Sequence, residues 1–138
     1  MVPDYSINKI VDALPGIKIS IEPEDLICYG FDASGIEERP SAIVWPKNTE
    51  EVVKVMQYAF QNEIPVTPRG AGTGMTGGSI PLNGSIALSF EKMNRLVELD
   101  GNNLNVIVEP GIINGRLQRE LEYLGFFYPP DPASMNFC

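Results

Sequence analysis

Histidine is absent from this chain of 138 residues, and cysteine occurs only twice, as Cys28 and Cys138. The chain therefore lacks the commonest general base and the commonest metal ligand of enzymes. The two cysteines lie too far apart in the sequence to suggest a disulfide framework or metal-ligand spacing. Cys28 is predicted to be a buried free thiol, and the sequence offers no metal site and no catalytic residue.

Positive charge is also scarce, because 10 Lys and Arg stand against 18 Asp and Glu, which gives a net charge of -8. Proteins that bind DNA or RNA neutralise phosphates mainly with Lys and Arg, so we expect no nucleic-acid partner. The hydrophobic content of 43% in a chain of this length predicts a globular domain with a real core.

Long apolar segments are missing too. No stretch approaches the roughly 20 apolar residues of a transmembrane helix. The first five residues do not begin a basic region followed by an apolar stretch, as a secretory signal would. We therefore expect a cytoplasmic protein with no transmembrane segment.

Glycine, in contrast, is concentrated in one place. Residues 68–78 read Pro-Arg-Gly-Ala-Gly-Thr-Gly-Met-Thr-Gly-Gly and follow a strand-like segment. Glycine allows the main chain to approach a ligand closely, and successive N–H groups can then converge on a phosphate. The first hypothesis is a phosphate-bearing cofactor, and the alternative is that these glycines only make tight turns.

The segments before this loop predict a strand, a helix and a second strand. Residues 41–45 are a short apolar run, Asn48 and Glu51 can form a capping box, and residues 64–67 are extended. This pattern predicts a right-handed crossover between parallel strands. The glycine loop would then lie at the carboxyl end of a parallel strand, where open α/β sheets bind ligands. The buried face of the helix is predicted to carry Val52, Val53, Met56, Ala59 and Phe60.

Two familiar phosphate-binding motifs do not fit the loop. Residues 72–77 match G-x-G-x-x-G, but that fingerprint must open a helix, and here Pro81 and the Asn83-Gly84 turn follow. No Gly-Lys-Ser/Thr is present, which excludes a P-loop. Backbone N–H groups without a helix dipole must therefore hold the anion.

The remaining segments indicate a mixed α/β (α+β) fold. We expect a helix over residues 6–14, extended or loop structure over 17–40, and a strand over 85–90. Strands at 97–99 and 104–108 should form a hairpin, in which Leu104, Val106 and Val108 face inward, and a helix after residue 112 should end at Gly125. The aromatic residues predicted to lie in the core are Trp45, Tyr58, Phe60, Phe126, Phe127 and Tyr128.

Three segments together resemble a known family: residues 68–81, 109–111 and 128–134. They are similar to the FAD-binding (PCMH-type) domain of the vanillyl-alcohol oxidase superfamily, and most to its branch of glycolate oxidase and D-lactate dehydrogenase. The resemblance implies a first subdomain with a small parallel β-α-β sheet, followed by a mixed or antiparallel sheet with helices. It divides the chain into a helix and irregular lead-in, residues 1–40, and the FAD-binding domain, residues 41–138, truncated at its C-terminal end.

By this resemblance the cofactor is FAD, and the loop surrounds its diphosphate while the 130–134 segment passes near the flavin. The implied cofactor-binding residues are Arg69, Gly70, Ala71, Gly72, Thr73, Gly74, Thr76, Gly77, Gly78, Pro130, Asp131 and Ser134.

The family oxidises small 2-hydroxy acids to 2-oxo acids, so the resemblance implies a substrate such as glycolate or D-lactate and partner subunits of an oxidase complex. Family members continue beyond a segment like residues 135–138, and the substrate site would lie in that missing region, which would leave this fragment inactive alone. The alternative function is a non-catalytic nucleotide- or phosphate-binding module.

Overall fold

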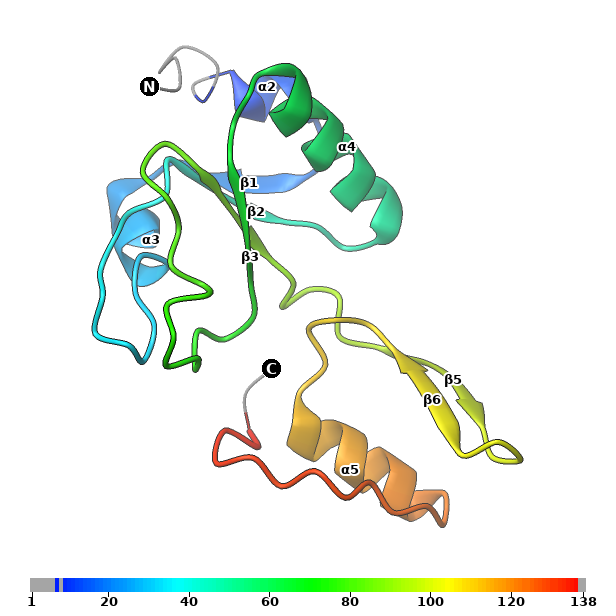
Figure 1. The fold of residues 1–138 in the computed structure, drawn as a ribbon. Helices are drawn as coiled ribbons and strands as arrows, with labels where there is room; N and C mark the ends of the chain where they lie inside the picture. The colour runs from blue at the N-terminus through cyan, green and yellow to red at the C-terminus, as the bar shows by residue number, and fades with distance from the viewer. Residues whose placement is uncertain (1–6, 8, 137–138) are drawn as a thin grey trace.

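The computed structural model describes residues 7 and 9–136, which form a sheet with its helices and a second, smaller unit (Figure 1). The sheet has the strand order β1-β2-β4-β3, and the second unit contains the hairpin β5-β6 and helix α5. The strands are β1 (Lys18–Ser20), β2 (Ala42–Trp45), β3 (Val66–Arg69), β4 (Ile86–Ser89), β5 (Leu96–Asp100) and β6 (Asn105–Val108), and the helices are α2 (Ile10–Ala13), α3 (Pro23–Cys28), α4 (Thr49–Gln61) and α5 (Asn114–Tyr123).

The order of the strands differs from a simple crossover. β2 and β3 are parallel, as the sequence predicts, but β4 lies between them and pairs in parallel with both. Leu88 of β4 is opposite Val44 on one side and Pro68 on the other. Proline cannot donate to a ladder, and it is accommodated here because β3 is an edge strand. β1 covers the other edge in antiparallel orientation.

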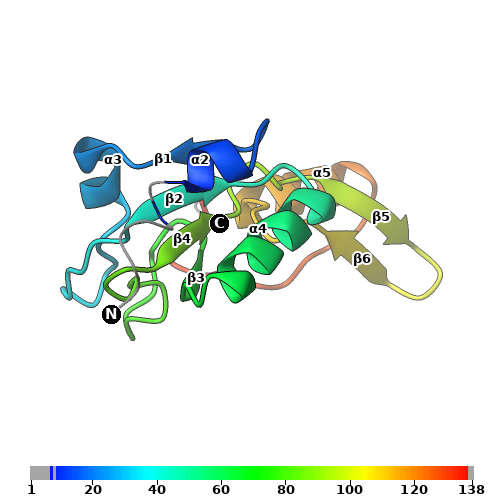
Figure 2. The same cartoon turned by 90° about the horizontal axis from the view of Figure 1, so that it is seen from above.

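The core lies mainly on one face of this sheet, which α2 and α4 cover, while α3 packs on the other face (Figure 2). Ala42 and Val44 of β2 point to the α2 and α4 side, and Ile43 and Trp45 point to the α3 side. All four are buried, as expected for a parallel strand covered on both faces. The predicted burial of Trp45 is confirmed, and its Nε1 donates to the hydroxyl of Tyr29 at 2.9 Å.

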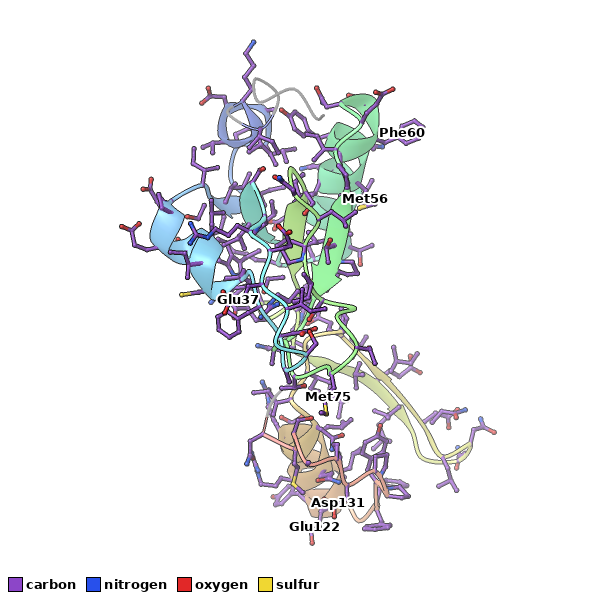
Figure 3. The ribbon with its side chains drawn as sticks, turned by 60° about the vertical axis from the view of Figure 1, so that its left-hand side comes forward. Glu37, Met56, Phe60, Met75, Glu122 and Asp131 are labelled. Atoms are coloured by element: carbon purple, nitrogen blue, oxygen red, sulfur yellow. The ribbon has the colours of Figure 1, made fainter. Side chains whose placement is uncertain are left out.

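Helix α4 begins at its predicted cap, but only part of its predicted core face is buried: Ala59 is buried and Val52 is half-buried against the core, as predicted. The Asn48 Oδ1 accepts from the Glu51 N–H at 2.9 Å, while the Glu51 carboxylate accepts from Lys47 N–H rather than from Asn48. Val55 and Ala59 are buried. The predicted core positions Val53, Met56 and Phe60 are exposed, with Phe60 87% accessible, and Figure 3 shows Met56 and Phe60 on the outer side of the helix. Both rows have helical spacing, so the sequence could not choose between them.

The segment predicted to be extended or loop, residues 17–40, also contains helix α3. Pro23 occupies the first turn of this helix after an extended Glu22. Proline is compatible with the first helical position because the N–H it lacks would have no intrahelical partner there. Cys28, at the end of α3, is exposed, so the prediction of a buried thiol was wrong.

The second unit confirms the predicted hairpin and helix, and Gly125 ends α5 with φ +84°. Val106 and Val108 are half-buried as predicted, but Leu104 is 77% exposed and has φ +56° because it lies in the turn. Phe127 is also exposed, whereas Phe126 and Tyr128 are half-buried, as is Tyr58 in α4.

Two predictions concern residues at the chain ends. Ser6, the predicted start of the first helix, and Cys138 lie outside the described residues. Within residues 7 and 9–136, no helix is both long enough and apolar enough to cross a membrane.

Candidate functional site

The glycine loop leaves the carboxyl end of β3 and returns as β4, as the sequence predicts for a ligand-binding loop of a parallel sheet. The loop extends from that end of the sheet toward α5 and the C-terminal segment (Figures 1 and 3). Most of its residues are exposed: Ala71, Thr73, Gly74, Met75, Thr76 and Gly78.

The N–H groups of this loop have no acceptor in the part of the protein that the structure describes. Among the described residues, none of the main-chain N–H groups of residues 70–79 donates a hydrogen bond to another protein group. The carbonyl groups, in contrast, are used: Gly74 O accepts from Ala33 N–H at 3.1 Å and Gly77 O accepts from Ile80 N–H at 3.1 Å. The loop is thus fixed through its acceptors and leaves its donors for a ligand or solvent, as an anion-binding loop requires.

Glycine is required at the turn of this loop. Gly72 has φ +71°, a conformation that other residues rarely adopt. A Cβ atom at position 72 would also collide with the guanidinium of Arg69. Gly74, in contrast, has open space where a Cβ atom would lie and no positive φ, so the loop itself does not require glycine there.

Arg69 lies beneath the loop rather than in front of it. Its side chain is buried, and its Nη2 donates to Phe31 O at 2.6 Å while Nη1 donates to Ser79 O at 3.3 Å. The guanidinium carbon is 5.6 Å from the centroid of the Tyr29 ring. Burial lowers the pKa of Arg69 from its ordinary value, and in the described part of the chain no carboxylate oxygen lies within 4 Å of it. Its positive charge therefore lies behind the row of N–H groups.

Asp32 is a residue of this site that the sequence analysis missed. Its carboxylate is buried, with Oδ1 accepting from Ser34 N–H at 2.8 Å and Oδ2 accepting from the Ser79 hydroxyl at 3.2 Å. The hydrogen bonds from Ser34 lower the pKa of Asp32, and Ser79 and Arg69 add to this shift. The Asp-Ala-Ser spacing could have indicated the local turn, but not the contact with a residue 47 positions later.

The second predicted segment, residues 130–134, follows α5. Pro130 O accepts from the side-chain amides of Gln118 and Asn114, and Met135 O accepts from Gly115 N–H at 2.7 Å. Pro130 and Asp131 are exposed and Ser134 is half-buried. Figure 3 shows Asp131 in the α5 unit and Met75 at the tip of the glycine loop. Within the described residues no hydrogen bond or ion pair joins the two segments.

Two pockets lie beside the loop and the α5 unit rather than in front of the N–H groups. One of about 510 Å³ is lined by Phe31, Glu37 and Asn83, among others, and one of about 460 Å³ lies between the hairpin and Phe126. Residues 70–79 line neither pocket, and most residues of the glycine loop are exposed.

A profile described as FAD binding domain matches residues 40–138 of the chain. The chain is 38% identical over 111 residues to the glycolate oxidase subunit GlcD of Bacillus subtilis and 39% identical over 110 residues to the D-lactate dehydrogenase of Anaerostipes hadrus. Each alignment covers 80% of this chain, but only 24% and 22% of those proteins. The chain spans about a quarter of the length of these relatives.

Solved structures show the same fold. An alkyldihydroxyacetonephosphate synthase superposes with a TM-score of 0.78 at 21% identity, over 93% of this chain and 25% of that one. A p-cresol methylhydroxylase with bound substrate superposes with a TM-score of 0.74 at 23% identity, over 88% of this chain and 25% of that one.

Proposed function

The chain belongs to the FAD binding domain family, and from this membership we propose that it forms the diphosphate-binding part of a flavin-dependent oxidoreductase. FAD is the cofactor of this family, and a relative from Mycobacterium tuberculosis is named as an FAD-linked oxidoreductase. The observation that carries the proposal is the row of N–H groups over residues 70–79, which have no acceptor within residues 7 and 9–136. Their chemistry fits the negative oxygens of a diphosphate.

We assign the cofactor contacts to two groups of residues. The N–H groups and short side chains of the loop would hold the diphosphate, with hydroxyl groups of Thr73 and Thr76 as further donors and the Arg69 charge behind them. Pro130, Asp131 and Ser134 would contact the cofactor from the other segment. The loop residues concerned are Gly70, Ala71, Gly72, Gly74, Gly77 and Gly78.

The substrate is proposed to be a small 2-hydroxy acid, which the complete enzyme oxidises to the 2-oxo acid. Glycolate, D-lactate and D-2-hydroxyglutarate appear in the names of relatives that are 30–39% identical to this chain, and all three are 2-hydroxy acids. The oxidation removes a hydride from the carbon that bears the hydroxyl and a proton from the hydroxyl oxygen. When bound, FAD supplies the acceptor for the hydride.

This chain would orient the cofactor, and the groups that bind the acid and take its proton would lie elsewhere in the enzyme. The bound substrate would therefore contact residues other than those of the glycine loop and the 130–134 segment. Three relatives are named as a subunit of glycolate oxidase, and this supports a role for partner subunits.

The Gly74→Val substitution tests the site. Position 74 has room for a side chain in the protein, so the variant should fold, but its isopropyl group would stand among the N–H groups. Loss of one or two hydrogen bonds to a charged ligand should weaken FAD binding roughly 10- to 100-fold. Flavin content and an FAD titration of the full-length protein measure this effect.

Asn102→Val is the matched control, because it places the same group in the exposed turn of the hairpin. Its flavin content should equal that of the unchanged protein. An undiminished affinity for FAD in Gly74→Val would refute the proposed site.

A further inference from the structure

A short segment before β2 fastens the glycine loop from its inner side. Phe31 O accepts from Arg69 Nη2, Ala33 N–H donates to Gly74 O, and Asp32 Oδ2 accepts from the Ser79 hydroxyl. Three consecutive residues thus reach the start, the middle and the end of the loop region. Each contact with the loop itself uses a carbonyl or a side chain, which leaves the main-chain N–H groups unused.

Asp32 is an unexpected residue at this place. A carboxylate close to an anion-binding loop repels the anion, and a buried carboxylate also loses hydration. Asp32 is only 7% exposed, and two of its neighbours, Ser79 and Arg69, belong to the loop region. A carboxylate at this place is explained if the stabilisation of the loop conformation by Asp32 outweighs the repulsion between Asp32 and the bound anion.

The local turn does not account for both carboxylate oxygens. In the local turn, Oδ1 accepts from Ser34 N–H, two residues later, and the Ser34 side chain also hydrogen-bonds the carboxylate. Oδ2 is directed to the Ser79 hydroxyl at the end of the loop. The carboxylate also compensates part of the charge of the buried Arg69, which has no closer ion pair among the described residues.

We propose that Asp32 is a positioning residue for the cofactor diphosphate: through Ser79 and Arg69 it holds the glycine loop with its carbonyls inward and its N–H groups outward. This role rests on the proposed FAD site and goes beyond it, because Asp32 acts on the loop and does not contact the ligand. Loss of the Asp32 carboxylate would allow the loop to change its conformation and would weaken FAD binding.

The test compares Asp32→Asn, Ser79→Ala and Ser79→Thr in the full-length apoprotein by fluorescence titration with FAD. Asparagine keeps an oxygen for the Ser34 turn but removes the charge, and alanine at 79 removes the hydroxyl donor. Both variants should raise the Kd for FAD roughly tenfold. Ser79→Thr keeps the hydroxyl and should bind FAD within about twofold of the unchanged protein.

A second measurement separates positioning from general damage. With FAD at saturating concentration, the oxidase activity of Asp32→Asn and Ser79→Ala should return to that of the unchanged enzyme. Asp12→Asn, the same chemical change at an exposed position of α2, should bind FAD normally.

Three outcomes would overturn the inference: an unchanged Kd in Asp32→Asn and Ser79→Ala, a Ser79→Thr variant as weak as Ser79→Ala, or activity that saturating FAD does not restore. Its failure is distinguishable from failure of the proposed function. If Gly74→Val weakens FAD binding while Asp32→Asn does not, only the role of Asp32 is wrong; if neither affects FAD binding, the proposed site itself is wrong.

Discussion

Gly111 has almost no room for a side chain. A Cβ atom at this position would overlap the carbonyl group of Phe90 and approach Met93 O to 3.0 Å. The Gly111 N–H also donates to Met93 O at 2.8 Å, which ties the Glu109-Pro110-Gly111 turn to the segment after β4. The backbone of this turn therefore packs directly against the backbone of the segment after β4, and this contact joins the sheet to the second unit.

Gly111→Ala should destabilise the protein by about 3 kcal/mol, because backbone atoms on both sides must move to admit one methyl group. The free energy of unfolding in urea measures the effect. Gly78→Ala is the control, since its Cβ would meet open space, and it should change the unfolding free energy by less than about 1 kcal/mol. Equal stability of the two variants would contradict the packing described for Gly111.

At the residue scale, the sequence predicted the exposed N–H donors of the glycine loop better than it predicted the contacts of Arg69 and Asp32, which hold the loop in place. A run of glycines at a strand end is a local signal, and its placement is confirmed. The burial of Arg69 and the approach of Asp32 depend on contacts between segments that are distant in sequence. Nothing in the local sequence of residues 31–34 points to the loop, so those contacts required the structure.

Helix α4 is the element whose start the sequence defined most clearly. The Asn48 side chain accepts from the Glu51 N–H and satisfies one of the donors that a helix N-terminus leaves without a partner. Glu50 and Glu51 also place negative charge in the first turn, where the helix dipole favours it. The cap fixes where α4 begins.

Asn48→Ala should lower the free energy of unfolding by about 1 kcal/mol, since it removes this cap. Gln57→Ala, on an exposed part of the same helix, should have almost no effect. Chemical denaturation of both variants gives the comparison. A loss of stability as large in Gln57→Ala as in Asn48→Ala would show that the cap is not the cause.

At the element scale, the sequence predicted whether a segment is a helix or a strand better than it predicted which elements pack or pair with each other. β2, β4, the hairpin and α5 each carry a local pattern, and each is present. The insertion of β4 between β2 and β3 was not predicted, although Pro68 in β3 is a local signal of an edge strand, whereas the all-buried β2 and β4 carry no proline. For α4, two rows of apolar side chains had equal helical spacing, and only packing against α2 and the sheet decided between them.

At the scale of the whole molecule, stability is linked to pH through three acidic groups of the described residues, Asp32, Asp100 and Glu109. Arg95 donates to both carboxylate oxygens of Glu109 and lowers the pKa of Glu109 below its ordinary 4.5. Hydrogen bonds from Ser34 and Asn103 lower the pKa values of Asp32 and Asp100 below 3.8. The folded state therefore binds fewer protons than the unfolded state, so these groups stabilise the protein above those ordinary values and lose their effect as pH falls through the lower folded values.

Stability should consequently decrease below about pH 5, and Glu109→Gln should reduce this acid dependence while lowering stability at pH 7. Urea midpoints measured between pH 3 and pH 7 test both effects. Glu98→Gln, on an exposed position of β5, serves as the control and should leave the pH profile unchanged. A Glu109→Gln profile as steep as that of the unchanged protein would contradict this linkage.

The connection from β3 to β4 has a consequence for how this protein tolerates changes of length. Parallel neighbours need a return of roughly a dozen residues or more, which is commonly supplied by a helix. Here residues 70–85 make that return without a helix, and the strand that they lead into is buried along its whole length. Because β4 is held in register with both neighbours, the return must end at Ile86, and an added residue would have to be accommodated within the exposed glycine loop.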